Sequence, residues 1–199
     1  MHAVRGAGPV TFFPSKGAPV TLSFGESVER PILSGLFQAR IAWLPDGSGG
    51  DRTDYEGSPV IIRGGDRLEL YAVKNPGLSR EGAMIFIWGW ARAASVPPDS
   101  ALVRFIQSSP FIAFDVRPPD ATYTFTLASG TPRHCYFDPG DLTEYAPLAA
   151  GDFDLILKDK LESPVQARIR ATAPGGRAIA YVIIGETAET ARLLAFPDP

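Results

Sequence analysis

Cysteine and histidine are nearly absent from this chain of 199 residues, and their scarcity limits the chemistry it can perform. The one cysteine is Cys135, so no disulfide framework forms within the chain. The two histidines are His2 and His134, and no Gly-x-Ser-x-Gly motif holds a nucleophile. Neighbouring residues of a strand point to opposite faces, so we do not expect His134 and Cys135 to form a catalytic pair. We interpret Cys135 as a small core residue and predict no catalytic residues.

Long apolar runs and blocks of like charge are also missing. No apolar run approaches the ~18 residues of a membrane-spanning helix, and the first residues lack the apolar stretch of a signal peptide. The 19 basic and 22 acidic side chains are mixed along the chain, which predicts no nucleic-acid or anionic-membrane surface. We therefore expect the protein in a virion or in the cytoplasm of the producing cell. A periplasmic or extracellular location is the alternative if a signal peptide was removed.

Acidic side chains gather in one loop, residues 46–56, which we tested as a cation site. Its carboxylates are those of Asp46, Asp51, Asp54 and Glu56. Calcium is bound by several oxygens at close spacing, but the EF-hand pattern fails because Ser48 and Gly50 stand where acidic or amide side chains are required. We interpret the loop as a solvated hairpin connection and predict neither a metal nor a cofactor.

Apolar residues alternate with polar ones along most of the chain, and 19 prolines and 20 glycines separate the alternating segments. The segments are 20–24, 37–43, 68–72, 101–107, 111–117, 123–127, 153–157, 165–171 and 178–184. Period-2 alternation broken by turn residues predicts an all-β protein of the antiparallel β-sandwich or jelly-roll type. The one helical candidate is 186–194, near the end of the chain.

The segment Ala93–Ser100 has the composition of a linker and divides the chain into near-equal halves. We predict two tandem β-sandwich domains, 1–93 and 101–199, joined by residues 94–100. Each half has a usual size for such a domain. The alternative is one large jelly roll in which Ala93–Ser100 is an ordinary loop between strands.

The stretch Gly82–Arg92 is apolar on both of its alternating faces, as in a strand that is covered on both sides. One face carries Met84, Phe86, Trp88 and Trp90. Large exposed apolar patches usually mark interaction sites, so we predict that these four residues form a partner interface.

Three sequence segments in the second half of the chain are similar to those of a known group of proteins. They are Ala101–Ile106 followed by Ser109-Pro110, then Tyr145–Gly151, and last Ala180–Gly185. In order and spacing this half resembles a group of bacterial envelope β-sandwich domains, which includes the small periplasmic accessory protein of alginate acetylation. The resemblance implies a binding or scaffolding role without catalysis, and no functional residue is carried over from it.

These observations favour a non-catalytic structural or assembly protein. It would be a β-sandwich subunit of a larger particle, of the virion coat, decoration or connector type, and its partners would be further copies or other protein subunits. The first alternative is an envelope or periplasmic accessory module with an adhesion-like binding role, as the resemblance implies. The second alternative is a carbohydrate-active enzyme, which would require two converging carboxylates in a cleft.

Overall fold

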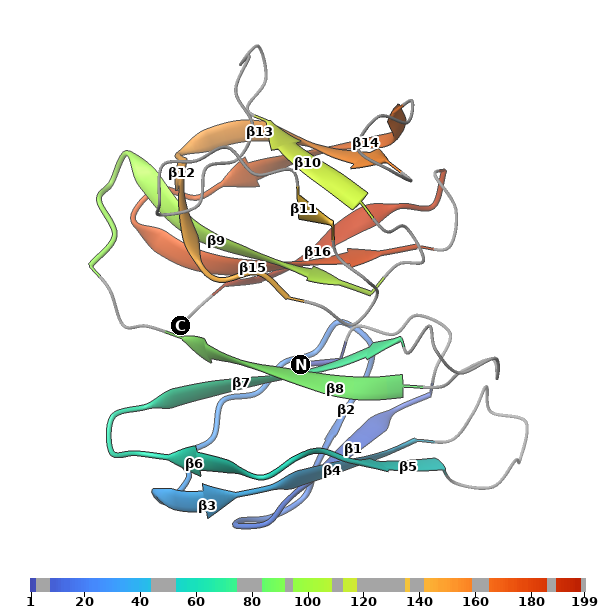
Figure 1. The fold of residues 1–199 in the computed structure, drawn as a ribbon, viewed down its shortest axis with the longest axis vertical. Helices are drawn as coiled ribbons and strands as arrows, with labels where there is room; N and C mark the ends of the chain where they lie inside the picture. The colour runs from blue at the N-terminus through green and yellow to red at the C-terminus, as the bar shows by residue number, and fades with distance from the viewer. Residues whose placement is uncertain are drawn as a thin grey trace. The chain divides into compact units, whose positions relative to one another are not determined.

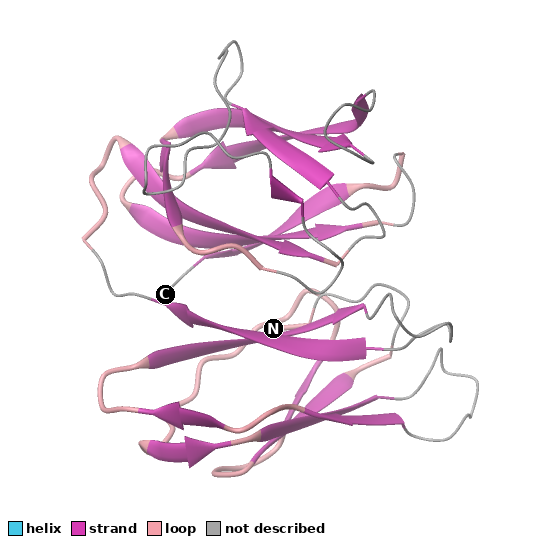
Figure 2. Ribbon diagram, in the orientation of Figure 1, coloured by secondary structure: helices cyan, strands magenta, loops and turns pink. Residues whose placement is uncertain are grey.

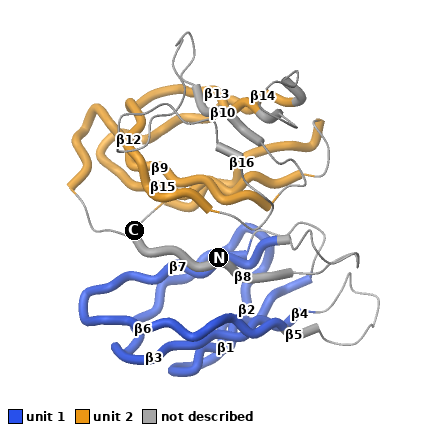
Figure 3. The backbone as a smooth tube through the Cα atoms, in the orientation of Figure 1, with its two compact units in different colours: residues 1–92 blue, residues 93–199 orange. Residues whose placement is uncertain are grey.

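The computed structural model describes residues 1–2, 8–43, 53–74, 84–91, 95–108, 113–117, 135–136, 142–158, 165–185 and 189–197. All regular structure in these ranges is β-strand (Figures 1 and 2), which confirms the all-β, sandwich-type prediction. The chain divides into two compact units, unit 1 (Met1–Arg92) and unit 2 (Ala93–Pro199), shown in blue and orange in Figure 3.

Unit 1 is built from short antiparallel strands. They are β1 (Val10–Pro14), β2 (Val20–Leu22), β3 (Gly35–Phe37), β4 (Ala39–Trp43), β5 (Thr53–Glu56), β6 (Val60–Ile62), β7 (Arg67–Lys74) and β8 (Met84–Ala91). A four-stranded sheet has the order β2-β1-β4-β5, and two-stranded pairs are formed by β3 with β6 and by β7 with β8. Residues of all three sheets meet in one core: Val10, Phe12, Leu22, Phe37, Ala39, Ile41, Trp43, Ile62 and Ala72.

The predicted strand 37–43 is interrupted at Gln38, where the chain changes its pairing partners. The predicted alternation is correct for Phe37, Ala39 and Ile41, which are all buried. At the break, the Ser15 amide donates to the Gln38 carbonyl (2.7 Å), and the Gln38 amide donates to Ser15 Oγ (2.9 Å). The Gln38 Nε2 donates to the Gly57 carbonyl (3.1 Å). The strand pairing therefore changes from β3–β6 to β4–β5 at Gln38, and these three hydrogen bonds hold the chain in place there.

Unit 2 is a sandwich of two four-stranded sheets. Its strands are β9 (Ser100–Gln107), β10 (Ala113–Arg117), β11 (Cys135–Tyr136), β12 (Ala146–Ala149), β13 (Gly151–Lys158), β14 (Val165–Ala173), β15 (Arg177–Ile184) and β16 (Arg192–Pro197). The sheets have the orders β12-β9-β15-β16 and β11-β10-β13-β14. The pair β9–β15 is parallel, unlike the other pairs and unlike the expected antiparallel pattern. A parallel pair needs a crossover connection, which strands of the other sheet supply between β9 and β15.

Three aromatic rings from both sheets form the centre of the unit 2 core. The Phe105 and Tyr181 rings are stacked with centroids 5.8 Å apart, and the Phe153 ring meets both edge-on, at 6.1 and 5.6 Å. The Tyr181 hydroxyl donates to the Thr172 carbonyl (2.7 Å), and burial raises the pKa of this phenol to about 12. The ring cluster holds the two sheets together, because Phe153 belongs to β13 and the other two rings to β9 and β15.

The prediction of a helix over 186–194 is wrong in the part that the structure describes. Arg192, Leu193 and Leu194 belong to β16 and pair with Ile184, Ile183 and Val182 of β15. Ladder hydrogen bonds and the packing of Leu193 against the core outweigh the local preference for a helix. Residues 186–188 and the predicted strand 123–127 lie outside the described residues.

Candidate interaction surface

Three large apolar side chains of unit 1 are exposed, and two of them are directly opposite each other in a strand pair. Leu33 is 76% exposed, Leu36 62% and Ile61 67%. Leu36 and Ile61 are directly opposite each other in the pairing of β3 with β6. Opposed residues of an antiparallel pair are near neighbours on one face of the sheet, so these two side chains form a continuous apolar surface. Leu36 and Ile61, with the exposed Leu33 two residues before β3 begins, are called the β3–β6 patch.

The alternation along β3 and β6 explains why these residues face outward. Phe37 and Ile62, the next residues along the two strands, are each only 3% exposed and belong to the unit 1 core. Successive side chains of a strand point to opposite faces, so burial of Phe37 and Ile62 turns Leu36 and Ile61 away from the core. Single exposed apolar residues are ordinary, but an opposed pair with a third residue close by in sequence is a candidate contact surface.

A basic side chain lies beside the start of β3. The Lys16 ammonium donates to the Ser34 carbonyl (3.1 Å), directly before β3 begins.

Two contacts describe part of the outer face of the adjoining sheet, β2-β1-β4-β5. The Arg40 guanidinium lies over the Phe13 ring, 4.6 Å from its centroid. On the next strands, the hydroxyls of Thr11 and Thr21 are hydrogen-bonded at 2.9 Å. These contacts give this part of the face the character of an ordinary solvated surface.

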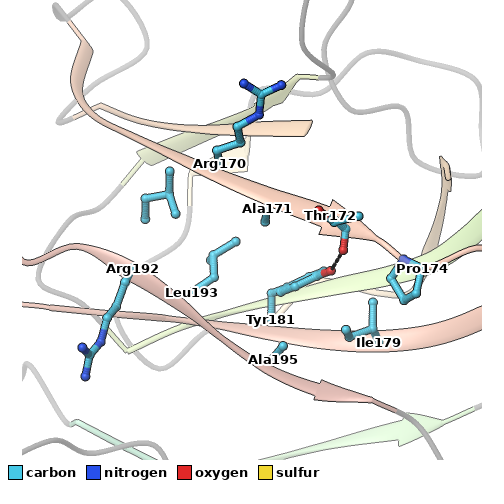
Figure 4. Close-up of a pocket in the computed structure, with 10 residues that line it drawn as sticks. Arg170, Ala171, Thr172, Pro174, Ile179, Tyr181, Arg192, Leu193 and Ala195 are labelled. Atoms are coloured by element: carbon cyan, nitrogen blue, oxygen red, sulfur yellow. Dashed lines mark hydrogen bonds between the residues drawn. The ribbon is translucent and has the colours of Figure 1, made fainter. Parts of the chain in front are cut away.

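Unit 2 contains a groove of about 520 Å³ between β14 and β16 (Figure 4). Its lining residues are Ile169, Arg170, Ala171, Thr172, Pro174, Ile179, Tyr181, Arg192, Leu193 and Ala195. Each of the two strands lies at the edge of its own sheet, so the groove is an open side of the sandwich. In Figure 4 the Arg170 and Arg192 side chains extend away from the apolar lining. The Arg170 guanidinium lies 3.3 Å from Asp152, on the outer face of β13 and β14.

A buried polar cluster surrounds the first two residues of the chain. The Met1 amine donates to the Leu70 carbonyl (2.9 Å), and the Ala72 amide donates to the Met1 carbonyl (2.9 Å). Burial lowers the pKa of the Met1 amine to about 5, against an opposing effect of the Glu69 carboxylate. Burial also lowers the pKa of His2, whose ring meets Phe24 edge-on at 6.2 Å. His2 is fully buried and the Met1 amine is hydrogen-bonded to the backbone of β7, so we assign the cluster a structural role.

The predicted interface residues all belong to β8, which pairs with β7. Met84, Phe86, Trp88 and Trp90 are opposite Lys74, Ala72, Leu70 and Leu68, respectively. The side chains of β8 lie outside the described part of the structure, so the predicted interface there stays a prediction.

The other residues considered as candidate catalytic or metal-binding groups lie only partly within the described residues. Cys135 begins β11, whereas His134 and residues 46–52 of the acidic loop lie outside the described residues. Asp54 and Glu56 belong to β5 and pair with Ala42 and Arg40 of β4. Within the described ranges, no three His, Cys, Asp or Glu side chains are grouped to hold a metal ion.

No protein-family model matches this chain, and no curated protein sequence is similar to it. Among the described residues there is also no helix long and apolar enough to cross a membrane.

The β3–β6 patch was not predicted from the sequence, because the strand β6 was not recognised there. A signal was present: Val60, Ile61 and Ile62 are three consecutive β-branched residues between Pro59 and a Gly-Gly turn. In a strand with one buried face, the middle residue of such a run must face the other way. The run therefore predicts one exposed apolar side chain.

Proposed function

We propose that this protein is a non-catalytic structural or assembly protein, a β-sandwich subunit of a larger particle of the virion coat, decoration or connector type. The β3–β6 patch is the observation that carries the proposal. It is formed by a regular strand pair that is held at Gln38, whose backbone amide bonds to Ser15 and whose side chain bonds to the Gly57 carbonyl. A surface held in place before association loses little conformational freedom when a partner covers it.

The energy available from one patch favours an assembly with several contacts. Each of its three side chains is 62–76% exposed, and covering it contributes roughly 1–2 kcal/mol. Association costs about 4–15 kcal/mol in lost freedom of motion. One patch against an inert surface is therefore too weak for stable binding. A particle in which each subunit makes repeated contacts supplies the difference.

Asp152 and Asp154, two acidic side chains of unit 2, lend no support to the alternative of a carbohydrate-active enzyme. Asp154 is bound by the Arg168 guanidinium at 2.8 Å. Asp152 accepts a hydrogen bond from Thr172 Oγ1 (2.7 Å) and lies close to Arg170. Both carboxylates belong to an ion-pair ladder along the outer face of β13 and β14, whereas glycoside hydrolysis uses carboxylates that converge on a cleft.

The test is the mass of the chain in solution, measured by light scattering over a concentration series. We expect a defined oligomer or growth into particles, and we expect Leu36→Glu to reduce association at least tenfold because it places a charge at the centre of the patch. Thr21→Glu, an exposed change on β2, is the matched control and should associate as the parent chain does. A parent chain that is monomeric at every concentration would contradict the proposal.

The same measurement tests the predicted interface on β8. Trp88→Glu and Ile87→Glu change adjacent positions, which face opposite sides of a strand. If β8 forms an interface, one of the two variants should stay folded and lose association. If both variants unfold, β8 is covered on both faces within the protein and the β8 prediction is wrong.

The groove between β14 and β16 favours a second candidate function, an accessory or adhesion-like binding module. Apolar grooves of several hundred Å³ with a few polar groups are typical of ligand sites. Binding of a ligand by a stable monomer, with loss of binding in Leu193→Glu, would favour this function over assembly.

A further inference from the structure

We propose that the groove between β14 and β16 binds an extended peptide strand, which pairs with the backbone of β14 and carries apolar and acidic side chains in alternation. The apolar side chains would enter the groove, and the acidic ones would meet Arg168 and Arg170 on the outer face. This inference rests on the binding-module function proposed for the groove and names its class of ligand. It does not involve the β3–β6 patch.

Both walls of the groove are edge strands, which favours a polypeptide as the occupant. Among the strands that the structure describes, β14 pairs only with β13, and β16 only with β15. An edge strand offers a row of backbone donors and acceptors to another extended chain. An acyl chain has no groups that match such a row.

One backbone acceptor of β14 is already used from the side of the groove. The Tyr181 hydroxyl donates to the Thr172 carbonyl (2.7 Å), and both residues line the groove (Figure 4). In an antiparallel pair, alternate residues direct their N–H and C=O groups toward the partner strand, and the others direct theirs away. The bond from Tyr181 indicates that Thr172 belongs to the second set. Arg170 and Arg168, at the preceding alternate positions, then direct their backbone groups away from β13 as well.

The side chains that line the groove leave room for those of an inserted strand. Ala171 of β14 and Ala195 of β16 are small, and Ile169 and Leu193 are only partly buried against the unit 2 core. The volume of about 520 Å³ is in the range of sites that enclose ligands. In an extended chain every second side chain points to the same face, so alternate apolar residues of the occupant would fill this space.

The strand β13 shows what β14 accepts on its paired edge. It carries Asp152 and Asp154 on its outer face, and the Phe153 side chain between them is buried in the core. Asp154 accepts a hydrogen bond from Arg168 (2.8 Å), and Asp152 lies 3.3 Å from the Arg170 guanidinium. An occupant with the same alternation of acidic and apolar residues would repeat this recognition on the opposite edge of β14.

The arginines can serve a second row of carboxylates. The side chains of Arg168 and Arg170 are 59% and 67% exposed, and a guanidinium has five N–H donors. On the other wall of the groove, Arg192 is exposed, and no carboxylate among the described residues pairs with it. Opposite charges on neighbouring strands stabilise their pairing, whereas like charges destabilise it. The groove should therefore select acidic strands over basic ones.

Fluorescence anisotropy with a labelled peptide tests the inference on the full-length chain. The probe is a synthetic peptide with the sequence of β13, Gly151–Lys158, and its control peptide carries Asp152→Lys and Asp154→Lys. We expect saturable binding of the acidic probe and at least tenfold weaker binding of the lysine peptide. Amide exchange should show new protection along β14 when the probe is bound, because pairing covers its backbone donors.

A charge exchange makes the test specific to the arginines. Arg170→Glu changes an exposed side chain, and we expect it to weaken binding of the acidic probe at least threefold and to strengthen binding of the lysine peptide. Arg63→Glu, an exposed change in unit 1, is the matched control and should bind both peptides as the parent chain does. Far-ultraviolet circular dichroism of each variant checks that it remains folded.

A second probe, the single-chain amphiphile dodecanoate, separates this inference from the binding-module function. Binding of dodecanoate that is lost in Leu193→Glu, without binding of the acidic peptide, would overturn the inference and leave a binding function for the groove standing. Binding of neither probe would overturn both. Equal binding of the two peptides would show that the arginines select no charge, and protection that is absent from β14 would place the peptide elsewhere. Either result would overturn the inference.

Discussion

Burial at Met1 and His2 makes the stability of the protein depend on pH. The folded state holds both groups in their neutral forms, because burial lowers the pKa of the Met1 amine to about 5 and lowers that of His2. The unfolded chain binds a proton at the amine below about pH 8 and at the imidazole below about pH 6.5. For each group, at a pH between its pKa in the folded state and its pKa in the unfolded state, the unfolded chain binds more protons than the folded one. The free energy of unfolding therefore rises with pH in that range.

For a chain that begins at Met1, we therefore expect the free energy of unfolding to fall as the pH is lowered from 8 to 5. The slope should be roughly 1 kcal/mol per pH unit for each proton taken up. Urea unfolding midpoints at several pH values measure it. Acetylation of the amine removes that group's titration, so the acetylated chain should show a smaller slope, restricted to the range in which His2 titrates. Equal midpoints at pH 5 and pH 8 would show that the Met1 cluster is open to solvent.

At the scale of single strands, the sequence predicts alternation better than pairing. The burial of Phe37, Ala39 and Ile41 follows from the period-2 pattern alone. The change of partners at Gln38 does not, because it depends on Ser15 and Gly57, each about twenty residues away. Pairing partners are therefore set by tertiary contacts that no local pattern contains.

The same reason explains the wrong helix and the missed patch. The local sequence around Leu193 predicts a helix. The strand β15, however, pairs with this segment through backbone hydrogen bonds, which the local sequence does not show. Exposure of Leu36 depends on which face of β3 meets the core, and β3 is too short to reveal this by itself. The candidate surface could be found only after β3 and β6 were placed opposite each other.

The turn between β15 and β16 depends on Gly185. Its φ is +118°, and a Cβ at this position would lie 2.5 Å from the Thr190 carbonyl oxygen. Gly151 has a similar φ of +121°, with no atom within 4 Å of the same position. Gly151→Ala therefore measures the cost of the backbone conformation alone, roughly 1–3 kcal/mol.

We expect Gly185→Ala to lower the free energy of unfolding by more than Gly151→Ala does, since it adds a backbone clash to the same conformational strain. Denaturant unfolding of the two variants measures the difference. Amide exchange should also show loss of protection along β16, the strand that follows the turn. Equal destabilisation by the two substitutions would mean that the chain at Thr190 moves aside without cost.

At the scale of the whole molecule, the buried apolar residues form two core clusters, one in each compact unit. The core of unit 1 draws its residues from β1 to β7, and that of unit 2 from β9 to β15. Ile41 and Leu155 are each fully buried, one in each core. Replacing a buried leucine or isoleucine by alanine costs about 2–5 kcal/mol through lost packing and the cavity that remains. If the two cores are independent, each substitution acts only on the unit that contains it.

Calorimetry of Ile41→Ala and Leu155→Ala tests this independence. We expect two unfolding transitions in the parent chain, with Ile41→Ala lowering the midpoint of one and Leu155→Ala that of the other. A domain of about 100 residues loses roughly 4–8 °C for each kcal/mol, so each shift is well resolved. A single transition that both variants shift equally would show that the units unfold together, as one jelly roll would. Intermediate behaviour, with each variant moving both midpoints unequally, would measure the free energy that couples the units.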